Sequence, residues 1–480
     1  MYIKKLILEN FKIFEGTNEF TFSKGVNYLV GENNSGKTTV FDAVKFLTKK
    51  VSRDQYIYQK YIQDISKDVS VTLVLGDCTI LPSKAKKYEN YINCDEDNSL
   101  IIKKTSEVLE VNGKKTSIQN VLVLNQETNE YENPTGVPNT ITALLDCLFI
   151  DANRHNEDIQ DFSSTKLMGK LVSKVTADFQ QTDEFKELEQ KHKEVFGEKG
   201  IGQQLTEIEQ KLSDTVKAQF GESEIKINFD FPKIKDLLKK GNIQVKEQGI
   251  NTDISEKGNG LQRAVLLALI QISAEYDDNE ANENILYFLD EPELFLHPRA
   301  QDKLLKSLNK LACNDNSQVF ITTHSPYILK NYNMNNSKVY ILDKDSEKIH
   351  YESMEDLVLP DVTVGEITYK AFKIPNVEFH HRLFSDIYGL WTEKVNKYRL
   401  TTIDEELFVG KYNLPTKKYI PKKWGQWKDE EDRSMPYIIR NCQDHPEVKE
   451  RNSYSEEELK SSIESLVQIY KDLKSEVNEE

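Results

Sequence analysis

Hydrophobic and polar positions alternate along the first third of the chain. Residues 1–14 (MYIKKLILENFKIF) and four segments between residues 68 and 135 (VSVTLVL, SLIIKKT, EVLEVNG and VLVLNQE) place apolar side chains near every second position. Alternation of this kind predicts strands with one buried face, and the turn residues between the segments predict an antiparallel β meander. Residues 145–154 (LDCLFIDANR) predict a buried strand that ends in a polar loop.

Helical spacing replaces the alternation between residues 166 and 220. This stretch is rich in Glu, Lys and Gln, and three glycines lie in its middle, at 197, 200 and 202. It predicts a short antiparallel helical hairpin with its tip at the glycines. Two interpretations are open: a solvent-exposed helical pair without a specific role, or an arm that mediates dimerisation.

The pattern becomes strand-rich again after the hairpin. EIKINFDF and NIQVKEQ predict two strands, and residues 260–276 predict a long apolar helix. Strand–loop–helix units at 284–311 and 317–331 follow, and the strand VYIL at 339–342 ends this part. Beyond about residue 355 the chain is aromatic and Lys-rich, and it ends in a helix, SEEELKSSIESLVQIYKDL.

Composition narrows the class of protein. A chain of 480 residues with 38% hydrophobic residues is long enough for one large folded unit or for two to three domains. It has no stretch of about 20 apolar residues, so we expect no transmembrane helix. The N-terminus predicts a strand rather than a signal peptide, which favours a cytoplasmic protein without a membrane partner.

Charge and cysteine usage add two exclusions. The net charge of −16 argues against nucleic-acid binding by the whole surface, but it is compatible with a local basic groove or a basic protein partner. The five cysteines have no CxxC spacing, which argues against a zinc ribbon or a disulfide framework and fits a reducing compartment.

A phosphate-binding loop follows the apolar strand VNYLV. Residues 31–38, GENNSGKT, match GxxxxGK[ST] in full and open the helix TTVFDAVKFL. In this loop the glycines let the backbone wrap a phosphate, and amide groups at the helix N-terminus donate to its oxygens. Lys37 is expected to reach the β- and γ-phosphates, and the Thr38 hydroxyl to hold Mg²⁺. The nucleotide-binding residues predicted here are Gly31, Asn33, Asn34, Ser35, Gly36, Lys37, Thr38 and Thr39.

Two further strands end in polar residues suited to nucleotide hydrolysis. ILYFLDEP carries Asp290, a predicted Mg²⁺ ligand, and Glu291, predicted to orient or deprotonate the attacking water. VFITTHSP carries His324, predicted to contact the γ-phosphate and that water. Lys37, Glu291 and His324 are thus the predicted catalytic residues.

A glycine-rich segment, SEKGNGLQR at 255–263, opens the apolar helix. Gly258 and Gly260 permit close backbone approach, and a helix N-terminus favours an anion. By itself such a segment is more often a structural helix cap.

The order of these motifs resembles the RecF/SMC/OLD group of ABC-class ATPases over residues 1–345. The motifs are Asn10-Phe11, GENNSGKTT, SEKGNGLQR, FLDEPELFLHPRAQ with His297-Pro298 and Gln301, and ITTHSP. The resemblance implies ATP and Mg²⁺ as ligands, bound between two heads, with Ser255, Gly258 and Gly260 of one head meeting the γ-phosphate on the other. For the glutamine-loop residue of such ATPases, two candidates remain: Gln126 and the loop 151–154.

The resemblance also implies an architecture. We expect an α/β fold: an ABC-type ATPase head, with a phosphate-loop sheet and an antiparallel meander, a helical-hairpin insertion and a mainly helical C-terminal domain. The predicted divisions are residues 1–165 and 223–350 for the two halves of the head, 166–222 for the hairpin, and 351–480 for a partner-binding domain.

The OLD nucleases of this group carry a Toprim domain after the head, which needs a DxD on an apolar strand. Asp343 and Asp345 have the DxD spacing but follow the strand VYIL, and we interpret them as a turn. A nuclease is therefore expected on another chain.

The tail, with GEITYKAFKIPNVEFHHRLF and MPYIIRNCQDHPE, resembles stand-alone ATPases of bacterial antiphage systems, of the PARIS type or the Septu type. That resemblance implies a separate effector nuclease, controlled in the manner of a toxin and its antitoxin, and a phage protein or nucleic acid as trigger.

Three features of the tail leave alternatives open. Arg440 and His445 fit the R-x₄-H pattern of HEPN ribonucleases, but a polar turn with bonds to backbone or Glu447 is the commoner arrangement. His380-His381 is interpreted as helix packing rather than a metal site. The segment 417–424, KKYIPKKW, interleaves cations and aromatics as in nucleic-acid sites, although a solvated loop is commoner.

These observations favour an ATP-driven sensor and scaffold of an antiphage system, built as a head-to-head dimer or a higher even oligomer. The alternatives are a RecF-like DNA-repair ATPase and an ATP-gated HEPN-like ribonuclease.

Overall fold

The computed structural model describes the chain in two compact units. Unit 1 comprises Met1–Asp146, Asn284–Glu293 and Asp315–Glu480, and unit 2 comprises Cys147–Glu283 and Leu294–Asn314. The described residues are 1–479 except 79–89, 112, 135–145, 152–161, 163–167, 170, 173–175, 177, 197–199, 222, 228, 239–240, 278–284, 295, 313–316, 332–335, 345–348, 354–357, 362 and 396–398.

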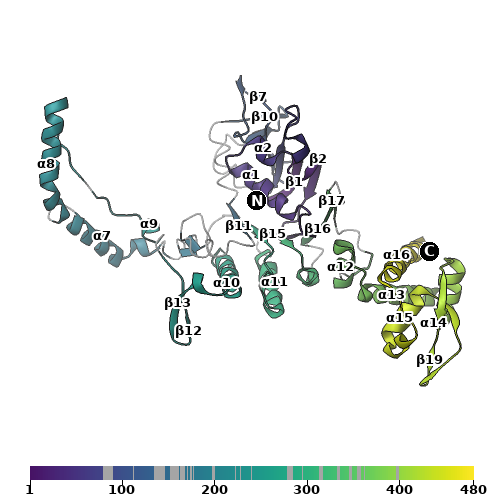
Figure 1. The fold of residues 1–480 in the computed structure, drawn as a ribbon. Coiled ribbons are helices and arrows are strands. Elements are labelled where there is room, and N and C mark those ends of the chain that lie inside the picture. Colours follow the sequence, from purple (N-terminus) through teal and green to yellow (C-terminus); the bar gives the residue numbers. More distant parts are fainter. Residues whose placement is uncertain are drawn as a thin grey trace. The chain divides into compact units, whose positions relative to one another are not determined.

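An antiparallel sheet forms the first layer of unit 1. Its strand order is β10-β9-β6-β4-β1-β2, and β5 pairs with β6. Strands β1, β2 and β10 of this sheet are labelled in Figure 1. This confirms the predicted meander, because β4, β6, β9 and β10 pair in chain order; β1 buries mainly one face, whereas nearly every residue of β4 is buried. The strands are β1 (Tyr2–Phe11), β2 (Phe14–Thr21), β4 (Ser70–Gly76), β5 (Ile92–Asn93), β6 (Ser99–Thr105), β9 (Leu122–Asn125) and β10 (Glu130–Glu132).

A second, mainly parallel sheet carries the predicted motifs. In unit 1 the strands β14, β15, β3 and β16 lie side by side in parallel, and β17 pairs antiparallel with β16. Almost every residue of β14 and β15 is buried, as expected for strands covered on both faces. The strands are β3 (Val26–Gly31), β14 (Ile285–Asp290), β15 (Ser317–Thr323), β16 (Ser337–Lys344) and β17 (Ile349–Ser353).

Asp343 corrects one expectation. It was predicted in a turn, but it lies in β16 and is in register with His350 of β17. The strand VYIL is longer than its apolar core because β17 supplies a second edge for it to pair with. Asp345 lies outside the described residues.

Side chains from several strands hold the elements of unit 1 together. The buried Gln318 of β15 donates to the carbonyl oxygens of Ile3 (2.9 Å) and Ser23 (2.7 Å) and accepts from the Ile3 N–H (2.8 Å). Lys104 of β6 donates to carbonyl oxygens at the end of α1, those of Phe46 (2.9 Å) and Lys49 (2.6 Å). A cation at a helix C-terminus is favourable, so Lys104 anchors the helix that begins at the phosphate loop. The helices here are α1 (Lys37–Thr48), α2 (Arg53–Tyr56), η1 (Gln59–Tyr61) and η5 (Pro326–Asn331).

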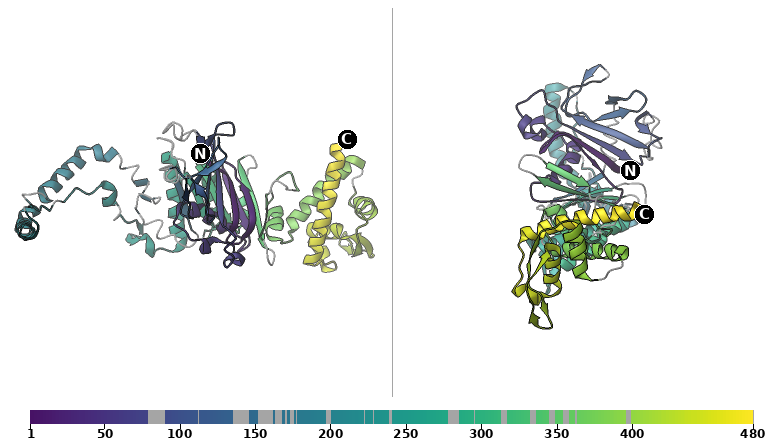
Figure 2. Two further views of the ribbon diagram at one scale, coloured as in Figure 1. Left: turned by 90° about the horizontal axis from the view of Figure 1, so that it is seen from above. Right: turned by 90° about the vertical axis from the view of Figure 1, so that its right-hand side faces the viewer.

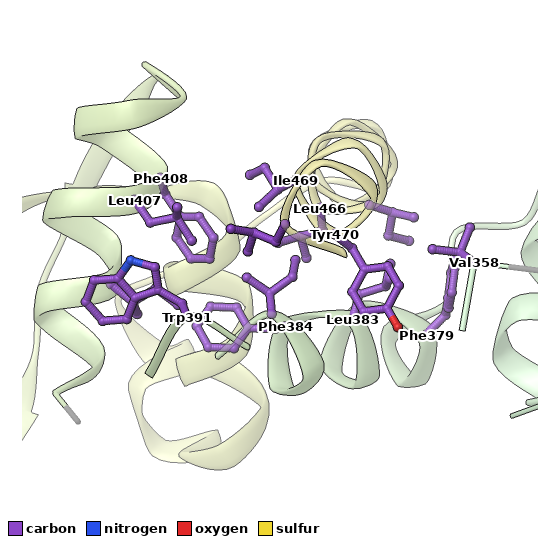
Figure 3. Packing of buried hydrophobic residues seen from close by; sticks show 14 of the residues in the cluster. Val358, Phe379, Leu383, Phe384, Trp391, Leu407, Phe408, Leu466, Ile469 and Tyr470 are labelled. Carbon is purple, nitrogen blue, oxygen red and sulfur yellow. The ribbon is translucent and has the colours of Figure 1, made fainter. Parts of the chain in front are cut away.

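The C-terminal part of unit 1 is mainly helical, as predicted. Helix α13 packs against α16 (Figure 2). Between the helices lies a core that includes Leu383, Phe384, Phe408, Leu466 and Ile469, with Trp391 at one end (Figure 3). The helices are α12 (Val364–Phe372), α13 (Val377–Val395), α14 (Leu400–Ile403), η7 (Asp404–Lys411), α15 (Met435–Asp444), η8 (Pro446–Glu450) and α16 (Glu456–Glu479).

Short β hairpins complete the secondary structure of unit 1. One of them turns at Trp424 and Gly425, which both have positive φ, and Trp424 is 99% exposed. The segment predicted as a solvated loop therefore contains short strands. The strands are β18 (Thr416–Tyr419), β19 (Lys422–Lys423), β20 (Gln426–Trp427) and β21 (Glu431–Ser434), and a separate hairpin pairs β7 (Glu110–Val111) with β8 (Lys114–Lys115).

Unit 2 contains the predicted helical insertion. Two helices, α7 (Asp183–Phe196) and α8 (Ile201–Phe220), lie on either side of the predicted glycine tip, but the predicted antiparallel pairing is wrong, because α8 runs away from α7 instead of back along it (Figure 1). The other elements of the unit are β11 (Asp146–Ile150), η3 (Asp178–Gln181), α9 (Ile234–Leu238), β12 (Gln244–Glu247), β13 (Ile250–Asp253), η4 (Ile254–Glu256), α10 (Asn259–Asp277) and α11 (Pro298–Ala312).

The segment EIKINFDF was predicted as a strand, and this is wrong. Its described residues lie along the two helices instead of in a ladder: the backbone N–H groups of Ile225 and Ile227 donate to Ser213 and Glu209 of α8. Phe231 contacts the rings of Phe185 and His192 on α7. Alternating apolar residues suit any extended segment with one covered face, and here helices provide the cover.

Within the described part of the chain, no helix is long and apolar enough to cross a membrane.

Candidate active site

The phosphate loop has the backbone that its glycines require. Gly31 ends β3 with φ +155°, and a Cβ there would lie 2.1 Å from the Leu342 carbonyl oxygen. Gly36 has φ +101°, and a Cβ there would lie 2.6 Å from Ile13. Conformation therefore disfavours a side chain at both positions, and at Gly31 the backbone of Leu342 also leaves no space for one. Helix α1 begins directly after the loop at Lys37, so its first N–H groups face the loop.

Lys37 lies folded over its own loop. Its ammonium group donates to the carbonyl oxygens of Gly31 (3.0 Å) and Glu32 (2.7 Å), and its side chain is 5% exposed. Burial lowers the pKa of Lys37 to about 8, although the carboxylates of Glu291 and Asp290 act in the opposite direction. The nearby Ser35 hydroxyl is buried without a hydrogen-bond partner among the described residues. A buried cation and an unsatisfied hydroxyl in one loop fit a phosphate ligand.

The carboxyl ends of three parallel strands bring the predicted acids to this loop. Asp290 of β14 is in register with Thr322 of β15, and Thr323 is in register with Val30 of β3. The last residues of these strands therefore share one edge of the sheet, the usual place for ligands in parallel sheets.

Thr38 and Asp290, the two predicted magnesium ligands, contact each other directly. The Thr38 hydroxyl donates to Asp290 Oδ1 over 3.2 Å, and the buried Thr322 hydroxyl donates to the same oxygen. Hydroxyl and carboxylate oxygens are ligands that Mg²⁺ takes together with phosphate oxygens and water. These two side chains fit such an ion, which would neutralise phosphate charge when bound.

Glu291 and His324 lie in direct contact. His324 Nε2 is 2.6 Å from Glu291 Oε1, and His324 Nδ1 is 3.5 Å from Lys37 Nζ. If Nε2 carries the imidazole proton, Nδ1 remains an acceptor toward the ammonium group, so the neutral ring satisfies both neighbours. Glu291 has φ +45°, and its N–H donates to the Thr322 carbonyl (3.1 Å) and hydroxyl (3.0 Å). A non-glycine residue in the left-handed region is strained, and two hydrogen bonds hold it there. Strain of this kind is found at functional sites.

Glu293 is a site residue that the sequence analysis missed. It is 7% exposed and accepts hydrogen bonds from the Thr323 hydroxyl (2.5 Å) and the His324 N–H (3.2 Å). The available signal was its position, two residues after Glu291, at the end of the same apolar strand. Only the folded structure shows that the Glu293 side chain turns inward, toward Thr323 and His324.

Ser255, Gly258 and Gly260 belong to unit 2, whereas the phosphate loop belongs to unit 1. Ser255 donates to Asp253 Oδ1 through both its N–H (2.9 Å) and its hydroxyl (2.7 Å), and Gln262 donates to the Ser255 carbonyl (3.2 Å). A Cβ at Gly258 would meet no atom within 4 Å. The loop before α10 is thus internally fixed and bare on its outer side, and its predicted role in trans stays a prediction.

The two predicted glutamine-loop positions remain untested. Gln126 directly follows β9, and its N–H donates to the Asn90 carbonyl (2.7 Å). Of the loop 151–154, only Asp151 belongs to the described residues.

Arg440 and His445 point to different partners. Arg440 pairs with Asp444 (2.6 Å), which also accepts from His381 (3.1 Å), while His445 faces Glu447 at 3.7 Å. The His445–Glu447 contact fits the polar-turn interpretation, whereas Arg440 lies within α15 and pairs with Asp444 along the helix. His380 is fully buried and contacts the Ser462 hydroxyl (2.9 Å), as expected for packing.

Comparisons with known proteins agree with this geometry. Residues 1–143 and 114–329, which together span 329 of 480 residues, match a family described as AAA ATPase domain. The Old nuclease of Escherichia phage P2 is 26% identical over 402 residues, covering 78% of this chain and 67% of that protein. Endonuclease GajA of Bacillus cereus is 28% identical over 129 residues, covering 24% of this chain and 19% of its own length.

Among solved structures, an SMC head bound to the C-terminal winged-helix domain of ScpA aligns with 74% of this chain and 98% of its own, at 16% identity and a TM-score of 0.43. Together, the family match and the OLD relative place the chain in the AAA ATPase domain family, as an OLD-like ATPase of the ABC class.

Proposed function

We propose that this ATPase is the sensor and scaffold of a bacterial antiphage system, in which ATP joins two heads and the joined state controls a separate effector nuclease. The observation that carries this proposal is the cluster of Lys37, Thr38, Asp290, Glu291 and His324 at one sheet edge. It contains the groups that bind phosphate, hold Mg²⁺ and activate water.

Hydrolysis in this proposal depends on the Glu291–His324 pair. Glu291 accepts a proton from, or orients, the attacking water, and His324 holds Glu291 in place through their 2.6 Å contact. Lys37 leaves its carbonyl partners to meet the phosphates, where the positive charge stabilises the transferred group.

The second head is needed for the opposite side of the nucleotide. The exposed loop 255–260 is anchored by Asp253 and Gln262, and the space outside Gly258 is open. A second copy approaching there would present Ser255 and the N-terminus of α10 to the γ-phosphate. ATP then acts as the link between two copies.

Support for an effector role comes from the relatives. Two of them are named nucleases, and the chain spans 67% of one and 19% of the other. The tail also resembles stand-alone defence ATPases. From this resemblance of the tail we place the nuclease on a partner chain, with a phage protein or nucleic acid as the trigger.

Phage plating tests the defence role. The Lys37→Ala variant, expressed with the neighbouring genes, should lose protection, because the phosphates lose their cation. A matched change on an exposed helix, Lys460→Ala of α16, should keep protection. Full protection by Lys37→Ala would contradict the proposal.

A further inference from the structure

Glu293 lies directly behind the catalytic pair, and its contacts join two loops. Glu293 follows β14, whereas its partners Thr323 and His324 belong to the end of β15. A single oxygen, Oε1, accepts from the Thr323 hydroxyl (2.5 Å) and from the His324 N–H (3.2 Å). The loop that carries Glu291 is therefore tied to the loop that carries His324.

The tie also fixes how the chain leaves β15. The Thr323 hydroxyl, fully buried, donates to Glu293 and accepts from the Ser325 N–H (2.9 Å). Thr323, His324 and Ser325 are thus all held by one buried carboxylate, directly or through one hydroxyl. The direction of the His324 side chain follows from the backbone that these bonds hold.

The adjacent Thr322 holds the other half of the site. Successive side chains of a strand point to opposite faces, so Thr322 faces away from Thr323. Its hydroxyl donates to Asp290 and accepts from the Glu291 N–H (3.0 Å). The two neighbouring threonines thus bind two different acids: Thr322 binds Asp290, and Thr323 binds Glu293.

We propose that Glu293, acting with Thr323, is a positioning residue of the ATPase site that sets the contact between His324 and Glu291. This inference rests on the roles given to these two residues in the proposed function. Its geometric basis is the pair of bonds from Glu293 to the His324 loop. Burial raises the pKa of Glu293, while its hydrogen bonds with Thr323 and His324 act in the opposite direction.

The test is a kinetic comparison of purified variants. Glu293→Leu removes the oxygen that accepts both hydrogen bonds and leaves the Thr323 hydroxyl and the His324 N–H unsatisfied. We expect kcat to fall on the order of 10- to 100-fold, as for other misplaced catalytic groups, while KM for ATP changes less than about threefold. Glu293→Gln keeps one acceptor oxygen and should retain most of kcat, and Thr323→Val should resemble Glu293→Leu.

A double-variant cycle shows whether Glu293 acts through His324. His324→Ala already removes the imidazole, so adding Glu293→Leu should lower kcat by less than about twofold more. Multiplied effects of the two changes, or a fall in ATP affinity instead of kcat, would overturn the proposal.

Two controls distinguish a positioning role of Glu293 from misfolding of the variant and from a wrongly assigned ATPase site. Glu366 is a second buried carboxylate that accepts two backbone N–H groups, those of Val358 (2.6 Å) and Leu359 (3.3 Å), so Glu366→Leu should leave kcat unchanged. If Glu293→Leu does not fold, Thr323→Val and Glu293→Gln carry the same test. Hydrolysis that persists in Lys37→Ala would refute the site itself, independently of Glu293.

Discussion

Burial of Lys37 disfavours its charged form. We therefore expect the binding of ATP to depend on pH. Burial lowers its pKa to about 8. Below that pH the side chain is a cation able to bind phosphate, and above it the neutral amine is favoured. The apparent affinity for ATP should therefore fall as pH rises, to about a tenth at pH 9 of the value at pH 7.

Calorimetric titration with ATP and Mg²⁺ at pH 7, 8 and 9 measures this change. In Lys37→Ala the binding should be weak and nearly flat with pH. An affinity in the unchanged protein that stays constant to pH 9 would show that Lys37 is not the titrating group.

Glu291 supports a second prediction at this scale. Glu291→Gln keeps the shape of the side chain but removes the base, so ATP should still bind while hydrolysis slows by about 100-fold or more. Single-turnover hydrolysis together with nucleotide retention on a filter measures both quantities. Rapid turnover by Glu291→Gln would assign the base to another group.

The site could be predicted from sequence only as far as short motifs reach. Lys37 and Thr38 lie in one contiguous pattern, and Asp290 and Glu291 follow an apolar strand. Glu293 was missed because its partner Thr323 is 30 residues away and only strand pairing brings them together. The position of the loop 255–260 relative to a second head is likewise a property of an assembly, which no single-chain pattern contains.

At the scale of elements, helices α13 and α16 share a core that includes a buried histidine. Burial lowers the pKa of His380 to about 3, and neighbouring His381 acts in the same direction. The unfolded chain binds a proton on this residue near pH 6.5, so acid favours unfolding. Between pH 7 and pH 5 this group should reduce the free energy of unfolding by about 2 kcal/mol.

Thermal or urea unfolding monitored by tryptophan fluorescence measures this loss, because Trp391 lies in the same core. His380→Leu should flatten the dependence on pH over this window. The same slope in both proteins would assign the acid sensitivity to other residues.

The same core supports a prediction on packing. Leu466 is fully buried on α16 (Figure 3), and Leu466→Ala should lower the free energy of unfolding of this region by about 2–5 kcal/mol. Lys460→Ala on an exposed position of the same helix should change it by less than about 0.5 kcal/mol. Equal effects of the two changes would mean that α16 is not packed as described.

Elements were predictable where periodicity was unambiguous. The meander and the helices α7, α8 and α16 follow from spacing alone. EIKINFDF was assigned to a strand because alternation marks one covered face, and it cannot tell whether a sheet or a helix provides the cover. The strand β16 extends through Asp343 because pairing with β17 outweighs the polar character of its last residues.

At the scale of the whole molecule, one chain supplies half of each ATP site in the proposed pair of heads. The phosphate loop and the loop 255–260 are each ordered by contacts within their own unit, and the outer side of Gly258 is open. This arrangement suits two heads that exchange these loops across a symmetric pair of sites.

Mixing two inactive variants tests that claim most directly. Lys37→Ala removes the phosphate cation, and Gly258→Asp places a carboxylate where the partner's γ-phosphate is expected, so each variant alone should hydrolyse almost no ATP. In an equal mixture, half of the dimers combine both chains and keep one intact site, so about a quarter of the original activity should return. A mixture no more active than its separate components would contradict a site shared between two copies.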